Sequence, residues 1–124
     1  MTDAAISLSF PARQGYAIFL RTAVSGAAAA YDLPLDALED LREAALEAFS
    51  ALTESAEEGA QALCDIYRAQ ADQVTLSLRL GGRVPGPEDN ADITRAVLLP
   101  LVNQAQVFYD ARGCTGVRMT LRVG

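Results

Sequence analysis

The sequence predicts an α/β (α+β) two-layer sandwich, in which a mixed, largely antiparallel sheet of about five strands is covered on one face by three helices. Two observations carry this prediction. Several short segments alternate apolar and polar residues, as strands with one wet face do. Three longer segments repeat apolar residues at helical spacing. The 124 residues, 51% of them apolar, fit one domain spanning 1–124 with one core.

The N-terminal part of the chain predicts one strand followed by one helix. Residues 6–10 (ISLSF) alternate apolar and polar side chains, and Pro11 ends this strand. A broad apolar stripe then predicts a helix that runs to about Tyr31. The stripe consists of Tyr16, Phe19, Leu20, Ala23, Val24 and Ala27. Gly26 costs such a helix roughly 1 kcal/mol relative to Ala, so we expect it to allow another element to pack closely.

A second, acidic helix follows a break in the pattern. Asp36 and Glu39 have the spacing of an N-cap and its reciprocal partner, and Pro34 just upstream is compatible with a helix start. The apolar pattern fades near residues 53–59, with Gly59 as the stop. The predicted core face is Leu38, Leu41, Ala45, Ala48, Phe49 and Leu52. The aromatic residues expected in the core rather than in a ligand pocket are Tyr16, Phe19 and Phe49.

The second half of the chain predicts two hairpins. Residues 62–69 and 73–80 alternate and are joined by a short loop, so these strands should be antiparallel. Residues 107–123 predict two more strands around a glycine-containing turn at Arg112–Gly116. In the last strand one face carries Val117, Met119, Leu121 and Val123. The opposite face carries Arg118, Thr120 and Arg122.

A loop and a third helix separate the two hairpins. Residues 81–90 are rich in Gly and Pro and predict a loop. Residues 91–106 are helical in pattern, and Pro100 should kink or divide that helix. The predicted order is therefore strand, helix, helix, strand, strand, helix, strand, strand.

Charge and composition exclude several kinds of function. The formal net charge is -6 and no basic stripe is present, so nucleic acid is not an expected partner. The chain has no His, which removes His general-base chemistry, and two cysteines cannot form a zinc site alone. Cys64 and Cys114 are expected to be reduced and buried, although a disulfide stays open. The N-terminus lacks the pattern of a signal peptide and no apolar run could span a bilayer, so we expect a cytoplasmic protein without membrane contact.

Three stretches, taken in order, resemble the GHKL ATPase fold, and more narrowly the anti-sigma-factor serine kinases. They are ISLSFPARQGYAIFLRTAVSG, the acidic helix DALEDLREAALEAFSAL and the closing strand GVRMTLRV. The acidic helix holds a pattern close to D-L-x-x-A-x-x-E-A, which in that family precedes a catalytic asparagine. Here the pattern is formed by Asp40, Leu41, Ala44, Glu47 and Ala48. The resemblance covers most of the chain.

The resemblance implies a site on this acidic helix. In the family a glutamate activates the nucleophile, and an asparagine one turn later holds magnesium against the phosphates. Glu47 matches the glutamate and is the one candidate catalytic residue, as a remnant. Ala51 stands where the asparagine is expected, and its methyl group cannot coordinate Mg²⁺, which needs oxygen ligands.

The nucleotide-binding loops that the resemblance implies are also missing. Leu80 lies near the place of the adenine-reading acid and Gly82 near a loop glycine, but no Asp occurs between residues 74 and 88. No Gly lies between Gly86 and Gly113, so the phosphate-cradling loop is absent. The sequence therefore predicts no bound cofactor, with ATP and magnesium as the alternative.

The resemblance with stripped catalytic positions predicts a non-catalytic regulatory protein. It would bind a protein partner, a sigma factor or an anti-sigma antagonist, in a bacterial partner-switching system. A homodimer is expected, with the small apolar stretch Val24–Ala30 as its surface. Whether the protein is an enzyme stays open. One alternative is an ATP-binding serine/threonine kinase with atypical motifs. Another is an unrelated α+β dimerising domain, which a first and last strand in different sheets would favour.

Several charged residues allow two interpretations. Glu39, Glu43 and Glu47 recur every four residues, so Glu47 fits either a solvated acidic face or an inherited functional position. Arg21 is either a surface cation or a contact for a partner's acid. The arginines on the polar faces of strands either form a wet sheet face or bind an acidic partner helix. They are Arg79, Arg118 and Arg122.

Overall fold

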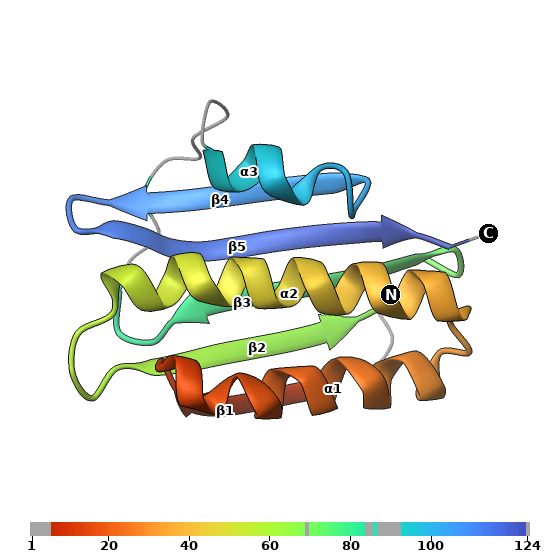
Figure 1. The fold of residues 1–124 in the computed structure, drawn as a ribbon, viewed down its shortest axis with the longest axis horizontal. Helices are drawn as coiled ribbons and strands as arrows, with labels where there is room; N and C mark the ends of the chain where they lie inside the picture. The colour runs from red at the N-terminus through yellow and green to blue at the C-terminus, as the bar shows by residue number, and fades with distance from the viewer. Residues whose placement is uncertain (1–5, 69, 84–85, 87–92, 124) are drawn as a thin grey trace.

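The structure is a computed structural model that describes residues 6–68, 70–83, 86 and 93–123. Five strands and three α-helices follow each other in the predicted order (Figure 1). The strands are β1 (Ile6–Pro11), β2 (Gln61–Tyr67), β3 (Gln73–Leu80), β4 (Gln104–Asp110) and β5 (Gly113–Arg122). The helices are the short 3-10 helix η1 (Gln14–Tyr16), α1 (Ala17–Ala30), α2 (Leu35–Ser55) and α3 (Ile93–Leu98).

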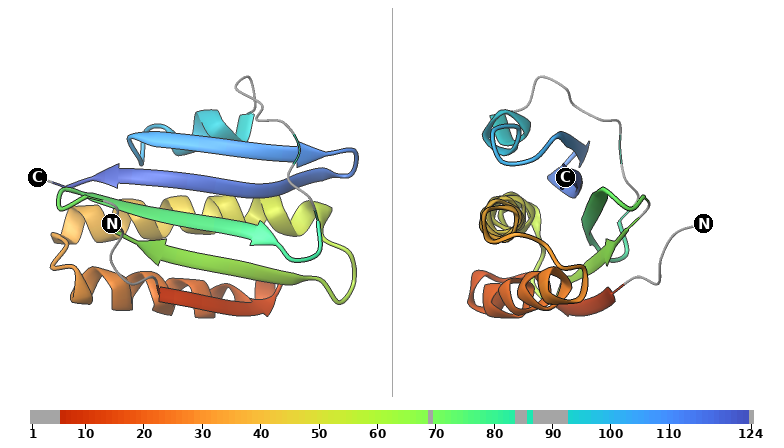
Figure 2. Two further views of the ribbon diagram at one scale, coloured as in Figure 1. Left: turned by 180° about the vertical axis from the view of Figure 1, so that it is seen from behind. Right: turned by 90° about the vertical axis from the view of Figure 1, so that its right-hand side faces the viewer.

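The strands form one sheet in the order β1-β2-β3-β5-β4. Every neighbouring pair is antiparallel, so the prediction of a mixed sheet was wrong for the described part of the chain. The helices lie together on one side of this sheet (Figure 2, right), which confirms the two-layer α+β sandwich. β1 and β5 belong to the same sheet, contrary to the arrangement that would have favoured an unrelated dimerising domain.

Helix α2 is the centre of the core. It packs against α1 on one side and against β5, β3 and α3 elsewhere. Its inward positions are short or apolar, and Phe49, Leu41 and Leu52 are fully buried. Beneath them the inward faces of the strands supply one continuous apolar layer, as period-2 alternation predicts. Its fully buried members include Ile66, Val74, Leu76, Leu78, Val107 and Met119.

The start of α2 differs from the prediction. Pro34, not Asp36, occupies the N-cap position, with extended backbone angles of φ -64° and ψ 159°. Proline suits this place because its fixed φ does not disturb the helix and it has no N–H to satisfy. Asp36 lies in the first turn, where its carboxylate accepts the N–H of Ala37 at 3.0 Å and favours the helix dipole. The helix ends at Ser55, and Gly59 (φ 83°) lies in the turn that follows.

The third helix is shorter than predicted and the last turn is displaced. α3 ends at Leu98 because Pro100 cannot continue it, and β4 begins at Gln104, inside the range predicted as helix. The β4–β5 turn is formed by residues 111–112, and Gly113, with φ 131°, already begins β5. A register shift in the β4–β5 pairing between Phe108 and Tyr109 inserts one extra residue into β5. The extra residue interrupts the period-2 alternation, so the sequence pattern did not indicate where the turn ends.

Helix α1 corrects three expectations. Phe19 is 51% exposed and stacks on Tyr16 instead of entering the core. Val24 and Ala27 are fully buried and Ala28 is 4% exposed, so the stretch Val24–Ala30 is not a free surface as a whole. Gly26 is exposed and a Cβ there would meet no atom within 4 Å, so no close approach accounts for it.

The described ranges contain no helix with the length and apolarity to cross a bilayer.

Candidate functional site

Glu47 lies beside a hollow between α2 and α3. The hollow measures about 200 Å³ and has walls from both helices. We call it the α2–α3 groove and define it by the residues that line it. They are Glu47, Ser50, Ala51, Glu54, Ile93, Thr94 and Val97. Glu47 is exposed on the helix face opposite the core, and Ala51 is half-buried one turn further on.

The α2 wall of the groove follows from helical spacing. Glu47 and Glu54 are seven residues apart, which places both carboxylates on one face, two turns from each other. Ser50 lies between them along the same face. Ala48, Phe49 and Leu52 on the opposite side of the helix are buried and hold this face at the surface. Two acids and a hydroxyl group thus form an acidic ridge along one side of the groove.

The α3 wall is apolar and exposed. Leu98 is fully buried and Arg95 donates to the carbonyl of Ala105 at 3.0 Å, so these contacts hold α3 against β4. The opposite side of this short helix presents Ile93 and Val97, which are 81% and 44% exposed. Exposed apolar side chains beside acidic residues are typical of surfaces that a partner protein buries.

The chemistry of the groove does not fit magnesium and a nucleoside triphosphate. Ala51 offers no oxygen at the expected metal position, and the described residues contain no group of three or more metal-ligating side chains. Glu47 and Glu54 would repel phosphates, and no cation is among the described residues that line the groove. The volume also falls below the roughly 300–1,000 Å³ that small-molecule sites usually have.

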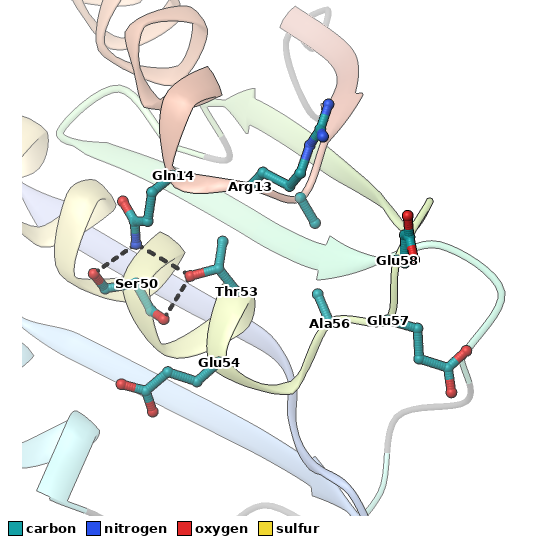
Figure 3. Close-up of a pocket in the computed structure, with 9 residues that line it drawn as sticks. Arg13, Gln14, Ser50, Thr53, Glu54, Ala56, Glu57 and Glu58 are labelled. Carbon is teal, nitrogen blue, oxygen red and sulfur yellow. Dashed lines mark hydrogen bonds between the residues drawn. The ribbon is translucent and has the colours of Figure 1, made fainter.

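A wider, open hollow of about 640 Å³ adjoins the C-terminal end of α2 (Figure 3). Gln14 spans it from η1, donating to Ser50 at 2.9 Å and to Thr53 at 3.1 Å. Arg13 and Glu54 point away from each other in this view. Glu54 lines both this hollow and the α2–α3 groove. The hydroxyl groups of Ser50 and Thr53 already accept hydrogen bonds from the amide of Gln14. We therefore interpret these residues as a contact that holds η1 against α2 rather than as a reactive site.

A buried arginine fixes the end of α2 against the β4–β5 hairpin. The guanidinium of Arg83 donates to both carboxylate oxygens of Asp110, at 2.9 and 2.6 Å, and to the carbonyl of Ser55 at 2.7 Å. The hydrogen bonds from Arg83 and from the backbone N–H of Arg112 lower the pKa of Asp110 below its ordinary value. Ser55 in turn donates to the carbonyl of Cys114. These contacts fix where the groove lies relative to the sheet.

The two cysteines do not form a reactive site. Cys64 and Cys114 are both buried and are not joined by a disulfide bond. Burial raises the pKa of the Cys64 thiol to about 12, so it stays protonated and unreactive at neutral pH. They act as small apolar members of the core.

The other positions suggested by the resemblance do not join the groove. Leu80 is buried in the core and Gly82 is exposed with φ 76° in the turn after β3. Of the residues that line the groove, the sequence pattern indicated Glu47 but not Glu54, Ile93 or Val97. The two-turn spacing from Glu47 could have indicated Glu54. Ile93 and Val97 are part of the apolar pattern that predicts a helix in this segment, and only the packing of α3 on β4 places them outward.

No protein-family model matches this chain, and no curated protein is significantly similar to it. The interpretation of the site therefore depends on its geometry and on the resemblance drawn from the sequence.

Proposed function

We propose that this protein is a non-catalytic regulatory protein that binds a partner protein through the α2–α3 groove. The observation that carries the proposal is the pairing of an acidic ridge, Glu47 and Glu54, with the exposed apolar residues Ile93 and Val97 across the groove. A helix with basic and apolar side chains on one face would complement both walls. We therefore assign the groove to a basic, amphipathic helix of the partner.

The resemblance to anti-sigma-factor serine kinases suggests which partners to test. A sigma factor or an anti-sigma antagonist in a partner-switching system would be recognised without phosphoryl transfer. Ala51 in place of the magnesium-holding asparagine is consistent with this role. The GHKL assignment and the cytoplasmic location belong to the same proposal.

A homodimer is also part of the proposal. Since Val24 is buried, the apolar side chains of α1 that such a contact would cover are Ile18 and Phe19, which are 55% and 51% exposed. Light scattering of the purified protein tests this part directly. A monomer at all concentrations up to those used for structural work would reject it.

The main experiment is capture of the partner from the native host. The tagged wild-type chain and the double variant Glu47→Gln/Glu54→Gln are used as baits. We expect a protein recovered by the wild type and lost with the double variant, because both carboxylates face the groove. Recovery that is equal with both baits would contradict a role for the groove.

A melting experiment separates this proposal from an ATP-binding kinase. A ligand at 100 times its dissociation constant stabilises the fold by roughly 2.7 kcal/mol, so Mg-ATP binding would raise the melting temperature visibly. We expect no shift with millimolar Mg-ATP, for the wild type or for Ala51→Asn. The amide that this substitution adds would not suffice, since Glu47 and Glu54 still repel the phosphates. A clear shift in the wild type would replace the proposal by the kinase alternative.

A further inference from the structure

A third hollow is lined by residues of β3, β4 and β5. It lies on the face of the sheet that points away from the helices, the face that Figure 2 (left) shows from the front. It measures about 350 Å³, within the range of ligand-binding pockets. We call it the Gly116 hollow. Its lining includes Arg79, Arg83, Gln106, Phe108, Gly116 and Arg118.

The strand register explains why the sheet is hollowed at this point. Gly116 on β5 is paired with Arg79 on β3 and with Phe108 on β4, so these residues form one row across the sheet. The middle residue has no side chain, and its neighbours on both sides are large. A Cβ at position 116 would lie 3.3 Å from the carbonyl oxygen of Leu78, so the position is also tight for any other residue. The floor is therefore backbone, with an arginine and an aromatic ring as walls.

The charge of this hollow is opposite in sign to the net charge of the chain. Arg79 and Arg118 are exposed, and neither forms an ion pair with another residue in the described ranges. They are diagonal neighbours on adjacent strands, roughly 7–8 Å apart at the backbone. The chain carries a net charge of -6, and eight of its 16 acids lie between residues 35 and 58, on α2 and the turn after it. Two guanidinium groups that form no ion pair within the described part of the chain thus lie on the face opposite the acidic helix.

We propose that the Gly116 hollow binds an extended acidic segment of a partner protein. A large apolar side chain of the segment would lie over Gly116 against Phe108, and carboxylates on either side would pair with Arg79 and Arg118. Guanidinium groups are suited to this because their planar fork matches a carboxylate. In an extended peptide, residues two apart point to the same side, so alternating acidic and apolar residues present both groups together. This surface is separate from the α2–α3 groove and does not depend on the function proposed for it.

A capped synthetic peptide of sequence Ser-Glu-Ser-Phe-Ser-Glu-Ser, labelled with a fluorophore, is the probe. We expect anisotropy titrations to show binding to the wild-type chain, weakened about tenfold in Arg79→Ser/Arg118→Ser. Chemical-shift changes in ¹⁵N spectra of the wild type should concentrate on β3, β4 and β5 around Gly116. Replacing both Glu residues of the peptide by Gln, or its Phe by Ala, should weaken binding as well.

Arg122→Ser provides the matched control. Arg122 is exposed on the same face of β5, four residues beyond Arg118, but does not line the hollow. Its substitution should change the affinity by less than about twofold. Equal losses of peptide affinity in the control and the double variant would mean that the effect arises from net charge alone, which would overturn the proposal. Absence of binding to the wild type, or shifts confined to α2 and α3, would also overturn it. So would concentration-dependent assembly of the protein alone that the double variant abolishes, because the occupant would then be a second copy.

Discussion

The α2–α3 groove and the Gly116 hollow lie on opposite faces of one sheet and differ in how they are built. The groove has walls of side chains from two helices, and its charge comes from Glu47 and Glu54 on the polar face of α2. The hollow is a gap in a strand face, floored by backbone at Gly116 and flanked by Arg79 and Arg118. The groove is therefore acidic and the hollow basic, although the chain as a whole carries a net charge of -6.

The comparison shows that each surface site depends on the helix or strands that form it. A helix brings residues 47 and 54 together only while its other face is buried, so the groove depends on the packing of α2. The hollow depends on the register of three strands, because one missing side chain must stand between two large ones. The two sites should thus respond differently to changes in the core, in the contacts between the layers and in surface charge.

Loss of the core anchor of α2 should have the largest effect. Phe49→Ala leaves a cavity under the helix and should lower the free energy of unfolding by about 3–5 kcal/mol, measured by urea denaturation. Phe19→Ala is the matched control, because Phe19 is 51% exposed, and should cost about 1 kcal/mol or less. Equal losses in the two variants would mean that α2 is not the centre of the core.

Arg83 joins the two sides of the molecule, and its replacement should have the next largest effect. Arg83→Met removes the hydrogen bonds to Asp110 and to the end of α2, so the melting temperature at pH 7 should fall by several degrees. Arg79→Ser, which breaks no ion pair within the described ranges, is the control and should leave the melting temperature unchanged. An equal fall in both variants would mean that the contacts of Arg83 add nothing beyond its charge.

The pH dependence of the Arg83 effect has a definite sign. Because folding lowers the pKa of Asp110, this carboxylate stabilises the protein above its unfolded-state pKa, and the stabilisation is lost as pH falls through the folded value. The melting temperatures of the wild type and Asp110→Asn should therefore differ at pH 7 and converge below about pH 4. A difference that persists at low pH would show that the contact between the layers is not electrostatic.

A charge substitution on one face should affect binding on that face alone. Glu47→Gln/Glu54→Gln should weaken a capped helical peptide with arginines and leucines on one side by about tenfold, with no change for the acidic peptide. Arg79→Ser/Arg118→Ser should do the reverse. Titrations with both peptides and both variants give the comparison. If either variant weakens both peptides equally, the two surfaces are not independent.

The smallest effect is expected at Gly26, on the exposed side of α1. Nothing lies within 4 Å of a Cβ at this position, so Gly26→Ala should stabilise the fold by about 0.5–1 kcal/mol through helix propensity alone. Urea denaturation of the monomer measures it. Destabilisation by this variant would indicate that α1 needs the glycine for a contact with another chain.

Much of the fold could be predicted from local pattern. Period-2 alternation placed β2 and β3 and their antiparallel pairing, and apolar residues at helical spacing placed α1 and α2 with Phe49 inside. These signals are local because one face of each element must be buried, and burial selects apolar residues at that element's period. Boundaries near Pro34, Pro100 and Gly113 were misjudged, because caps and bulges depend on hydrogen bonds that sequence spacing alone does not fix.

Local residue patterns were sufficient to predict the elements, their order, the acidic face of α2 and the missing oxygen ligand at Ala51. They could not predict that Ile93 and Val97 lie across a groove from Glu54, or that Gly116 lies between Arg79 and Phe108. Each of these juxtapositions joins residues that are far apart in the chain or on different strands. Their positions depend on packing and register, which are set by the whole core rather than by any local pattern.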